Sequence, residues 1–499
     1  MRIASLPDFL LQRIDRENGG PVNRQIYQVI RSAILSGMLP AGLQLPSSRD
    51  LSQELHMSRN TVTYAYEQLI AEGYLETRHG AGSFVADTQP NNLGVHHQHE
   101  HSAETKQRGN RPGLSERGQS LLSHAGVSDL QWGAFMPGVP DVTRFPNKIW
   151  SRLQNKVWRR SRAQLLTYGQ AGGYLPLRVA IADYLRVVRS VNCTPEQILI
   201  TTGIHQSIDL ITRMLGEYGD RAWLEDPCYW GTRSVLQSQG IQPVAIPVDA
   251  EGLCPRPEDL WQAPRFIVVT PSHQYPLGTV MSLSRRRLLL EYAASAQSWI
   301  IEDDYDSEFR YGSRPLASLQ GMDSNQRVLY MGTFTKTLFP GLRVGFLVAP
   351  THIAAGLATA HSELYRGGQM FTQAILAEFM QEGYFTAHIR RMRVLYAERL
   401  DLLQQAIASH FGDQLPTLGG EAGLHLAVQL PAQCDDMAIS QAARAIGLVA
   451  RPLSRYYMHA ATAKPGLLLG YACVPSEEII PAFDRLAAII KQHWPGQAD

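Results

Sequence analysis

The sequence predicts a multidomain protein in which a small, mainly helical domain with a β-hairpin precedes a large α/β domain. Three observations lead to this prediction. Within residues 20–87, apolar side chains recur at helical spacing, and a glycine-centred stretch then alternates as a hairpin does. Within residues 129–499, short apolar runs alternate with amphipathic stretches, which is typical of a mostly parallel sheet covered by helices. A chain of 499 residues is also too long for one ordinary core.

Composition and charge narrow the class of protein. The formal net charge is +1, so whole-chain electrostatics predict neither nucleic-acid nor membrane binding, although a local patch can still bind DNA. No apolar run approaches the roughly 20 residues that cross a bilayer. The five cysteines are odd in number and form no CxxC pair, which favours free thiols in a reducing compartment. We expect a cytoplasmic protein with no membrane contact.

The domain at residues 20–87 has the element order of a winged helix-turn-helix. Residues 21–39 have helical spacing, and residues 45–55 combine a serine N-cap with a short amphipathic run. After a tight break, Ser58 opens a longer helix that ends at Gly73. Residues 74–85 then alternate around a glycine turn, as the strands of a wing do.

The first turn of the longer helix predicts a DNA contact, because such a helix enters the major groove through its N-terminal end. Its side chains can donate to phosphates or base edges, and the wing tip offers a histidine beside glycine amides. The alternative is a small helical accessory domain, since acidic residues slightly outnumber arginines in residues 1–87. The residues concerned are Ser58, Arg59, Asn60, Thr61 and Thr63 in the helix, with His79 and Gly80 in the wing.

Residues 88–128 are rich in polar residues, glycine and histidine, a composition that cannot bury a core and predicts a flexible linker. Its four clustered histidines are His96, His97, His99 and His101. Without a partner cluster of ligands elsewhere in the sequence, we predict no metal site.

In the large domain, each predicted strand ends where a polar motif begins. Because parallel strands align their carboxyl ends at one edge of a sheet, these motifs are expected to meet there. No GxxxxGK[ST] motif is present, which excludes a P-loop. The predicted strands are 198–202, 222–225, 266–270, 299–302 and 328–331.

One group of residues suits a phosphate. Gly203, Ile204 and His205 lie between a strand and a helix start, where backbone amides and the helix dipole attract anions. Arg343 supplies a planar donor. Hydroxyl donors come from Thr333 or Thr335.

A second group suits a heteroaromatic ring that carries an aldehyde. Asp303 follows a buried run and needs a cationic partner, which a pyridinium nitrogen would be. Tyr229 can lie flat on the ring, and Tyr305 can reach a ring hydroxyl. Lys336 would form a Schiff base with the aldehyde. Each of these residues alone is more often structural, but their order and strand-end placement predict a pyridoxal phosphate site.

The N-terminal motifs resemble the GntR-type winged-helix domain. The resemblance rests on Leu45-Pro-Ser-Ser-Arg49-Asp-Leu, on Ser58-Arg-Asn-Thr61-Val, and on Glu72-Gly-Tyr-Leu75 through Gly80. It implies binding of double-stranded promoter DNA. The residues it assigns to the contact are Arg49, Ser58, Arg59, Asn60, Thr61, Thr63, His79 and Gly80.

The remainder resembles fold-type I aminotransferases of class I/II, and the fusion resembles the MocR subgroup of GntR regulators. The matching motifs are Gly138-Val-Pro-Asp141, Tyr168-Gly-Gln-Ala-Gly172, Pro176-Leu-Arg178, Glu225-Asp-Pro227, Thr270-Pro-Ser-His-Gln274 and Gly332 to Arg343. The resemblance implies a head-to-tail homodimer with Lys336 bound to pyridoxal 5'-phosphate. It also implies that an amine, an amino acid or pyridoxal phosphate itself acts as the effector.

Two positions depart from the aminotransferase pattern. Tyr275 stands where these enzymes usually place a cofactor-contacting asparagine, and Leu468 stands where an arginine usually binds the substrate carboxylate. Arg451 or Arg455 is a candidate replacement for that arginine. Three hypotheses follow: a ligand-sensing regulator, a regulator that responds to pyridoxal phosphate alone, and an active aminotransferase with an accessory DNA-binding domain. The fused winged helix favours regulation over turnover, with residual transamination left open.

Overall fold

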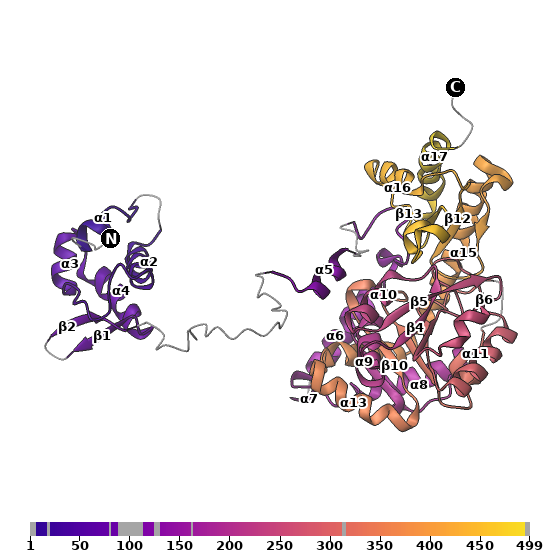
Figure 1. The fold of residues 1–499 in the computed structure, drawn as a ribbon, viewed down its shortest axis with the longest axis horizontal. Coiled ribbons are helices and arrows are strands. Elements are labelled where there is room, and N and C mark those ends of the chain that lie inside the picture. Colours follow the sequence, from indigo (N-terminus) through magenta and orange to yellow (C-terminus); the bar gives the residue numbers. More distant parts are fainter. Residues whose placement is uncertain are drawn as a thin grey trace, which may run out of the picture. The chain divides into compact units, whose positions relative to one another are not determined.

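The structure, a computed structural model, describes residues 6–16, 20–78, 81–87, 113–123, 130–160, 163–311 and 316–494. The chain divides into two compact units, Met1–Arg111 and Pro112–Asp499 (Figure 1). The expected DNA contacts His79 and Gly80 lie outside the described residues, as do the four clustered histidines and most of the expected linker.

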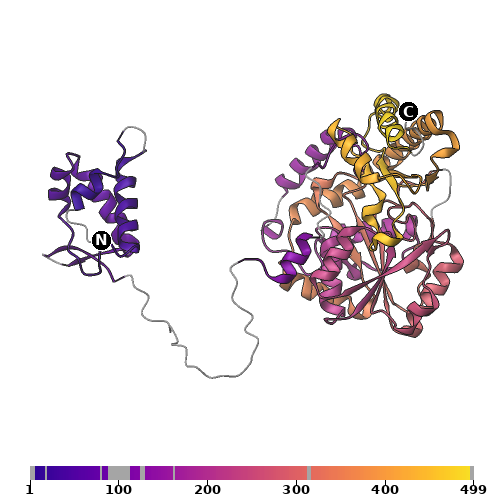
Figure 2. The same ribbon diagram turned by 45° about the horizontal axis from the view of Figure 1, so that its top comes forward.

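The first unit is a winged helix-turn-helix, as predicted. Ser47 caps α3 by accepting a hydrogen bond from the Asp50 amide, and Ser58 caps α4 by accepting one from the Thr61 amide. The helices of this unit lie together beside the two wing strands, which pair antiparallel (Figure 2). They enclose a small apolar core to which Ile30 and Leu69 belong. Its elements are α1 (Leu6–Leu11), α2 (Val22–Leu35), α3 (Ser48–Glu54), α4 (Arg59–Ala71), β1 (Leu75–Arg78) and β2 (Gly82–Val85).

A short helix lies within the segment for which the sequence predicts a linker. This helix, α5 (Glu116–Ser123), contacts α10 (Trp230–Ser238) of the second unit. Its leucines Leu121 and Leu122 are exposed, so the helix buries little apolar surface of its own. Composition alone did not predict this helix.

The second unit is built on an eight-stranded sheet in the order β3-β10-β9-β8-β7-β4-β5-β6. Strands β3, β4, β5, β7, β8 and β9 run parallel, whereas β10 is antiparallel to both of its neighbours. The strands are β3 (Ile198–Thr201), β4 (Arg221–Asp226), β5 (Gln242–Asp249), β6 (Gly252–Leu253), β7 (Phe266–Val269), β8 (Trp299–Asp304), β9 (Val328–Thr333) and β10 (Gly345–Val348).

Helices cover both faces of this sheet. One face packs against α9 (Ile204–Leu215), α10 and α13 (Thr351–Tyr365) through residues such as Leu224 and Ile301. The other packs against α8 (Leu175–Arg189) and α11 (Leu283–Ala296). Strands β7 and β10, which lie inside the sheet, are buried on both faces, which explains their continuous apolar runs. The remaining helices on this part are α6 (Asn147–Arg159), α7 (Ala163–Leu166), α12 (Leu319–Met322) and α14 (Met370–Gln381).

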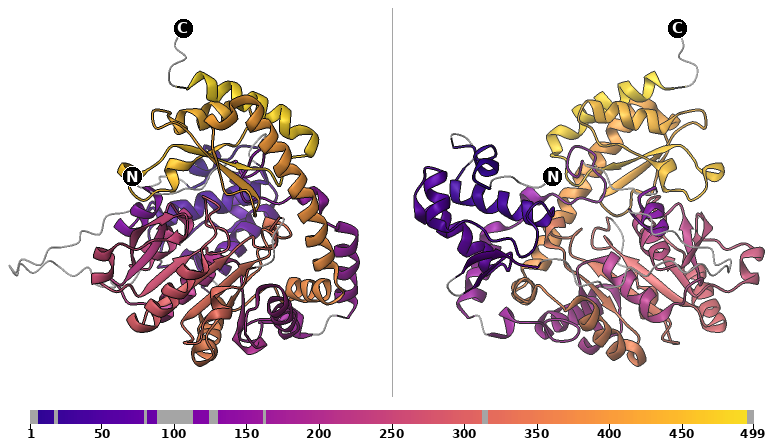
Figure 3. Two further views of the ribbon diagram at one scale, coloured as in Figure 1. Left: turned by 90° about the vertical axis from the view of Figure 1, so that its right-hand side faces the viewer. Right: turned by 60° about the vertical axis from the view of Figure 1, so that its left-hand side comes forward.

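A smaller antiparallel sheet in the order β11-β12-β14-β13 forms the C-terminal part of the same unit. It packs with α15, α16 and α17, drawn in orange and yellow in Figure 3. Its elements are β11 (Thr417–Leu418), β12 (His425–Gln429), β13 (Arg451–Pro452), β14 (Gly466–Gly470), α15 (Tyr384–Phe411), α16 (Asp436–Ala445) and α17 (Ser476–Gln492).

A buried ion pair holds the segment around Asp141 against α15. Arg399 of α15 donates from Nη2 to Asp141 Oδ2 at 2.8 Å, and both side chains are almost fully buried. The Asp141 amide donates to the Tyr396 hydroxyl at 2.8 Å. Burial alone would raise the pKa of Asp141, but hydrogen bonds from Thr143 and Arg399 hold it below the usual value.

We predict that Asp141→Asn lowers the free energy of unfolding of the large unit by about 3 kcal/mol at pH 7, because it leaves the Arg399 charge buried without a partner. Since the folded pKa is depressed, the wild-type advantage exists above the unfolded pKa of about 3.9 and is lost as pH falls through the folded pKa. Denaturant unfolding at pH 7 and pH 3 measures both effects. Asp183→Asn, which breaks an exposed pair with Arg186, is the control and should change little.

Candidate functional site

The carboxyl ends of the parallel strands meet around one cavity of about 280 Å³. All of the residues that the sequence analysis placed in a cofactor site line this cavity. They are Gly203, Ile204, His205, Tyr229, Tyr275, Asp303, Tyr305, Thr333, Thr335, Lys336 and Arg343. Gln131, Thr270 and Pro340 complete the lining.

One end of the cavity has the features of an anion-binding site. Gly203 is the N-cap of α9 and has φ +126°, a conformation that favours glycine. A Cβ on Gly203 would lie 3.8–4.0 Å from the guanidinium of Arg343, so the helix N-terminus and this cation lie side by side. No described carboxylate forms an ion pair with Arg343. The Thr333 and Thr335 hydroxyls lie 2.9 Å apart on the same lining.

Asp303 lies near the end of β8 with one oxygen unsatisfied. Its Oδ1 is buried and has no hydrogen-bond partner among the described residues. Burial, followed by the charge of Asp304, raises the pKa of Asp303 to about 7, while the charge of Lys336 opposes the rise. A buried carboxyl of this kind is stabilised by a cationic N–H donor, which a protonated pyridine nitrogen provides.

Lys336 follows the end of the neighbouring strand β9. Its Nζ donates to the carbonyl oxygen of Gly138 at 2.7 Å, and it forms no ion pair with Asp303. Burial lowers the pKa of Lys336, and the charges of Asp306 and Asp303 limit that fall. A lowered pKa increases the fraction of neutral amine, which is the nucleophilic form.

Aromatic rings form the walls of the cavity. Tyr229 stacks on His205 with ring centroids 5.7 Å apart, and burial raises the pKa of Tyr229 to about 12. Tyr275 lies edge-on to both Tyr229 and Tyr305. Its hydroxyl lies 3.3 Å from that of Tyr456, so it is the Tyr275 ring rather than a free hydroxyl that borders Tyr229 and Tyr305.

Sequence reasoning missed four contributors. The Gly138 carbonyl is invisible as a side-chain signal, and Gln131 belongs to no recognisable motif. Pro340 and Thr270 lie within matching motifs, but their side chains suggest no cofactor contact by themselves. The Thr270 amide and hydroxyl both donate to the buried Glu225, whose pKa burial raises to about 7.

The two candidate carboxylate-binding arginines differ in placement. Arg451 pairs directly with Leu468 across β13 and β14, so their side chains project from the same face of the sheet. Leu468 packs there with Tyr456 and Tyr275. Arg455 lies in the turn that follows β13.

In the first unit, the expected DNA-contact residues gather at the starts of α3 and α4. Arg49, Arg59 and Asn60 are exposed, and Arg59 Nε donates to Ser48 Oγ at 3.4 Å. Thr63 is half-buried. The Ser58 hydroxyl caps α4 and lies 2.8 Å from the Thr61 hydroxyl, so these two groups are already engaged within the protein.

Comparison with known proteins agrees with this geometry. Residues 22–85 match bacterial regulatory proteins of the gntR family, and residues 143–486 match aminotransferase class I and II. Among solved structures, the multiple substrate aminotransferase of Thermococcus profundus has a TM-score of 0.67 at 27% identity, covering 76% of this chain and 98% of its own. The kynurenine aminotransferase of Pyrococcus horikoshii has a TM-score of 0.66 at 26% identity, covering 76% and 95%.

The fold and the matches therefore define a GntR-type regulator with an aminotransferase-like domain, a class whose fold implies pyridoxal phosphate binding. A probable rhizopine catabolism regulatory protein, MocR of Rhizobium meliloti, is 39% identical over 92% of both chains. The pyridoxine biosynthesis regulator PdxR of Corynebacterium glutamicum is 33% identical over 87% of this chain and 88% of its own. This chain belongs to the MocR-like regulators of the GntR family. None of the described helices is long and apolar enough to cross a bilayer.

We predict that Asp303→Asn stabilises the cofactor-free protein at pH 8 by about 4 kcal/mol. The folded pKa of Asp303, about 7, lies above its unfolded value, so ionisation of the buried carboxyl costs stability as pH rises between the two values. At pH 5 the carboxyl remains largely neutral in the folded protein, so Asp303→Asn should stabilise the protein by less than it does at pH 8. Thermal unfolding at both pH values tests this, and a variant less stable than wild type at pH 8 would contradict it.

Proposed function

We propose that this chain is a pyridoxal phosphate-dependent, DNA-binding transcriptional regulator. Its large unit would hold the cofactor through Lys336 and sense a small amine, an amino acid or pyridoxal phosphate itself. The observation that carries this proposal is the unsatisfied Asp303 Oδ1 in the same cavity as Lys336 and the Arg343 corner. The cavity thus offers a partner for a ring nitrogen, an amine for an aldehyde and a cation for a phosphate.

Each residue has a distinct task in this proposal. Arg343 and the α9 N-terminus would bind the phosphate, Asp303 would hold the ring nitrogen protonated, and Tyr229 would pack on the ring. Bound pyridoxal phosphate supplies an aldehyde that combines reversibly with amines. Because burial lowers the pKa of Lys336, its neutral amine would be the group that holds that aldehyde.

The winged helix would place α4 in the major groove of promoter DNA. Arg49, Arg59 and Asn60 are exposed at the helix starts, where phosphates and base edges are reached. We also propose the head-to-tail homodimer that the family resemblance implies. Large exposed side chains at and after α6 support it, since a second copy would cover them: Trp158, Leu166 and Tyr168.

We assign the effector's carboxylate to Arg451 rather than Arg455. Arg451 shares the sheet face of Leu468, and its charge counteracts the burial-driven rise in the pKa of both Tyr229 and Tyr275. It therefore lies within electrostatic range of the aromatic wall without lining the cavity itself, and no described carboxylate pairs with it. Arg451 and Arg455 both exert such an influence on Tyr456. An amine that also carries a carboxylate is the effector class that fits this arrangement.

An active aminotransferase is the alternative function, favoured by the complete cofactor lining and by the aminotransferases among the solved structures. Promoter-fragment binding, measured with and without cofactor and candidate amines, separates the two. A regulator shows an amine-dependent change in DNA affinity of at least about tenfold, without sustained keto-product release.

The Lys336→Ala variant should lose both the visible cofactor absorption and this response to amines, but it should still bind DNA. Arg59→Ala should weaken DNA binding while leaving the visible cofactor absorption unchanged. Sustained keto-acid formation with unchanged DNA affinity would establish the enzyme instead.

We predict that Arg451→Met weakens the response to carboxylate-bearing amines by about tenfold or more, because a charge-assisted hydrogen bond contributes about 1.5–3 kcal/mol. Amines without a carboxylate should be unaffected. Arg455→Met is the matched control and should respond as wild type does. Titration of the cofactor's visible band with paired amines measures the change, and loss of the response in the Arg455 variant alone would reverse the assignment.

A further inference from the structure

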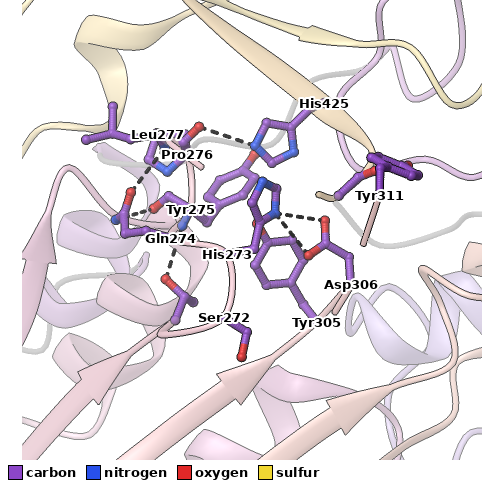
Figure 4. Close-up of polar contacts among 12 residues, drawn as sticks. Ser272, His273, Gln274, Tyr275, Pro276, Leu277, Tyr305, Asp306, Tyr311 and His425 are labelled. Atoms are coloured by element: carbon purple, nitrogen blue, oxygen red, sulfur yellow. Dashed lines mark hydrogen bonds and ion pairs between the residues drawn. The ribbon is translucent and has the colours of Figure 1, made fainter. Parts of the chain in front are cut away.

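A buried cluster of two histidines and a carboxylate lies behind the cavity wall. His273 follows β7, Asp306 follows β8, and His425 is the first residue of β12 (Figure 4). The three residues are only 2%, 1% and 2% exposed, respectively. The roles proposed above account for none of them.

One ring nitrogen of this cluster, Nδ1 of His273, lies within hydrogen-bonding distance of two side chains that offer oxygen atoms. His273 Nδ1 lies 3.1 and 3.2 Å from the two carboxylate oxygens of Asp306, and 2.9 Å from the hydroxyl oxygen of Tyr305. An ionised carboxylate only accepts hydrogen bonds, so Nδ1 must carry the proton. A protonated Nδ1 has no lone pair, and the Tyr305 hydroxyl therefore cannot donate to it. The Tyr305 oxygen can only accept from Nδ1, which shares its single hydrogen with Asp306, and the hydrogen of the Tyr305 hydroxyl is left to point elsewhere.

The packing prevents the His273 ring from leaving this arrangement. A Cβ on Gly423 would lie 2.1 Å from His273 Cε1, so the glycine backbone closes one side of the ring. The His425 ring lies 5.1 Å from the His273 ring. His425 Nε2 lies 3.2 Å from the Pro276 carbonyl oxygen, which requires a proton on that nitrogen and fixes this second ring as well.

We propose that His273 and Asp306 are positioning residues that keep the Tyr305 hydroxyl hydrogen directed into the cavity. There it would donate to the ring oxygen of bound pyridoxal phosphate. This inference rests on the proposed function, because it concerns the same site. In this arrangement His273 and Asp306 act through Tyr305 and do not contact the cofactor themselves.

The consequence is a pH dependence of the bound cofactor. A hydrogen bond donated to an anionic oxygen favours the deprotonated form and lowers its pKa. Loss of the Tyr305 donor should therefore raise the pH at which the visible absorption of the bound cofactor changes. Other groups facing Tyr305 or His273 from the surrounding elements also set that pH, and the variants chosen leave them in place: Glu225, Tyr275, Asp303, Asp306, Lys336 and His425.

Two substitutions at one position provide the test. His273→Leu removes the donor to Tyr305, whereas the amide nitrogen of His273→Asn can donate to both Asp306 and Tyr305. We expect the absorption midpoint of the holoprotein to rise by about one pH unit in His273→Leu and to stay near wild type in His273→Asn. Tyr305→Phe should raise it as well. Adding His273→Leu to Tyr305→Phe should then produce no further shift, because both act through one hydroxyl.

Equal shifts in the Leu and Asn variants would show a packing or charge effect and overturn the inference, as would additive shifts in the double variant. Tight binding of one zinc ion per cofactor-free chain, lost in His425→Ala, would also overturn it. The three residues can bring one ligand atom each within 4.8 Å of one another.

Should His273→Leu not fold, Tyr305→Phe alone must still raise the midpoint. A wild-type protein without a visible band would contradict the proposed function itself, whereas a band that His273→Leu leaves unmoved would contradict only this inference.

Discussion

The large unit depends on a buried carboxyl and a buried amine that are held in one cavity without forming an ion pair. Asp303 lies near the end of β8, and Lys336 follows the adjacent parallel strand β9, so the sheet positions both residues. Burial raises the pKa of Asp303 and lowers the pKa of Lys336, so each moves towards its neutral form. A ring with a protonated nitrogen and an aldehyde would satisfy both groups at once.

The surrounding structure supports that arrangement. The Asp141–Arg399 pair holds the segment whose Gly138 carbonyl receives the Lys336 amine, so a buried ion pair distant in sequence orients the reactive nitrogen. Arg343, which lies beside Gly203 at the start of α9, and the His273–Asp306 pair behind Tyr305 belong to other parts of the same cavity and its wall. Regulation would use this site by coupling its occupancy to the winged helix that precedes it in the chain.

Much of this could be predicted from sequence because the signals are local. Serine caps at Ser47 and Ser58 and the strand-end positions of Gly203 and Asp303 follow from short-range chemistry, and the structure has the corresponding elements there. The antiparallel direction of β10 is set by its neighbours, because its own four apolar residues suit either direction. The register that places Arg451 beside Leu468 joins strands that are distant in sequence. The His273, Asp306 and His425 cluster draws on three separate strands, so no motif could contain it.

The central claim is that Lys336 is the residue that carries the cofactor. Borohydride reduction of the pyridoxal phosphate-loaded protein, followed by peptide mapping by mass spectrometry, tests it directly because reduction makes the lysine linkage permanent. The account predicts one phosphopyridoxyl group per chain, on the peptide that contains Lys336, and no label in Lys336→Ala. A label on another lysine, or an equal label in the Lys336→Ala variant, would contradict the account.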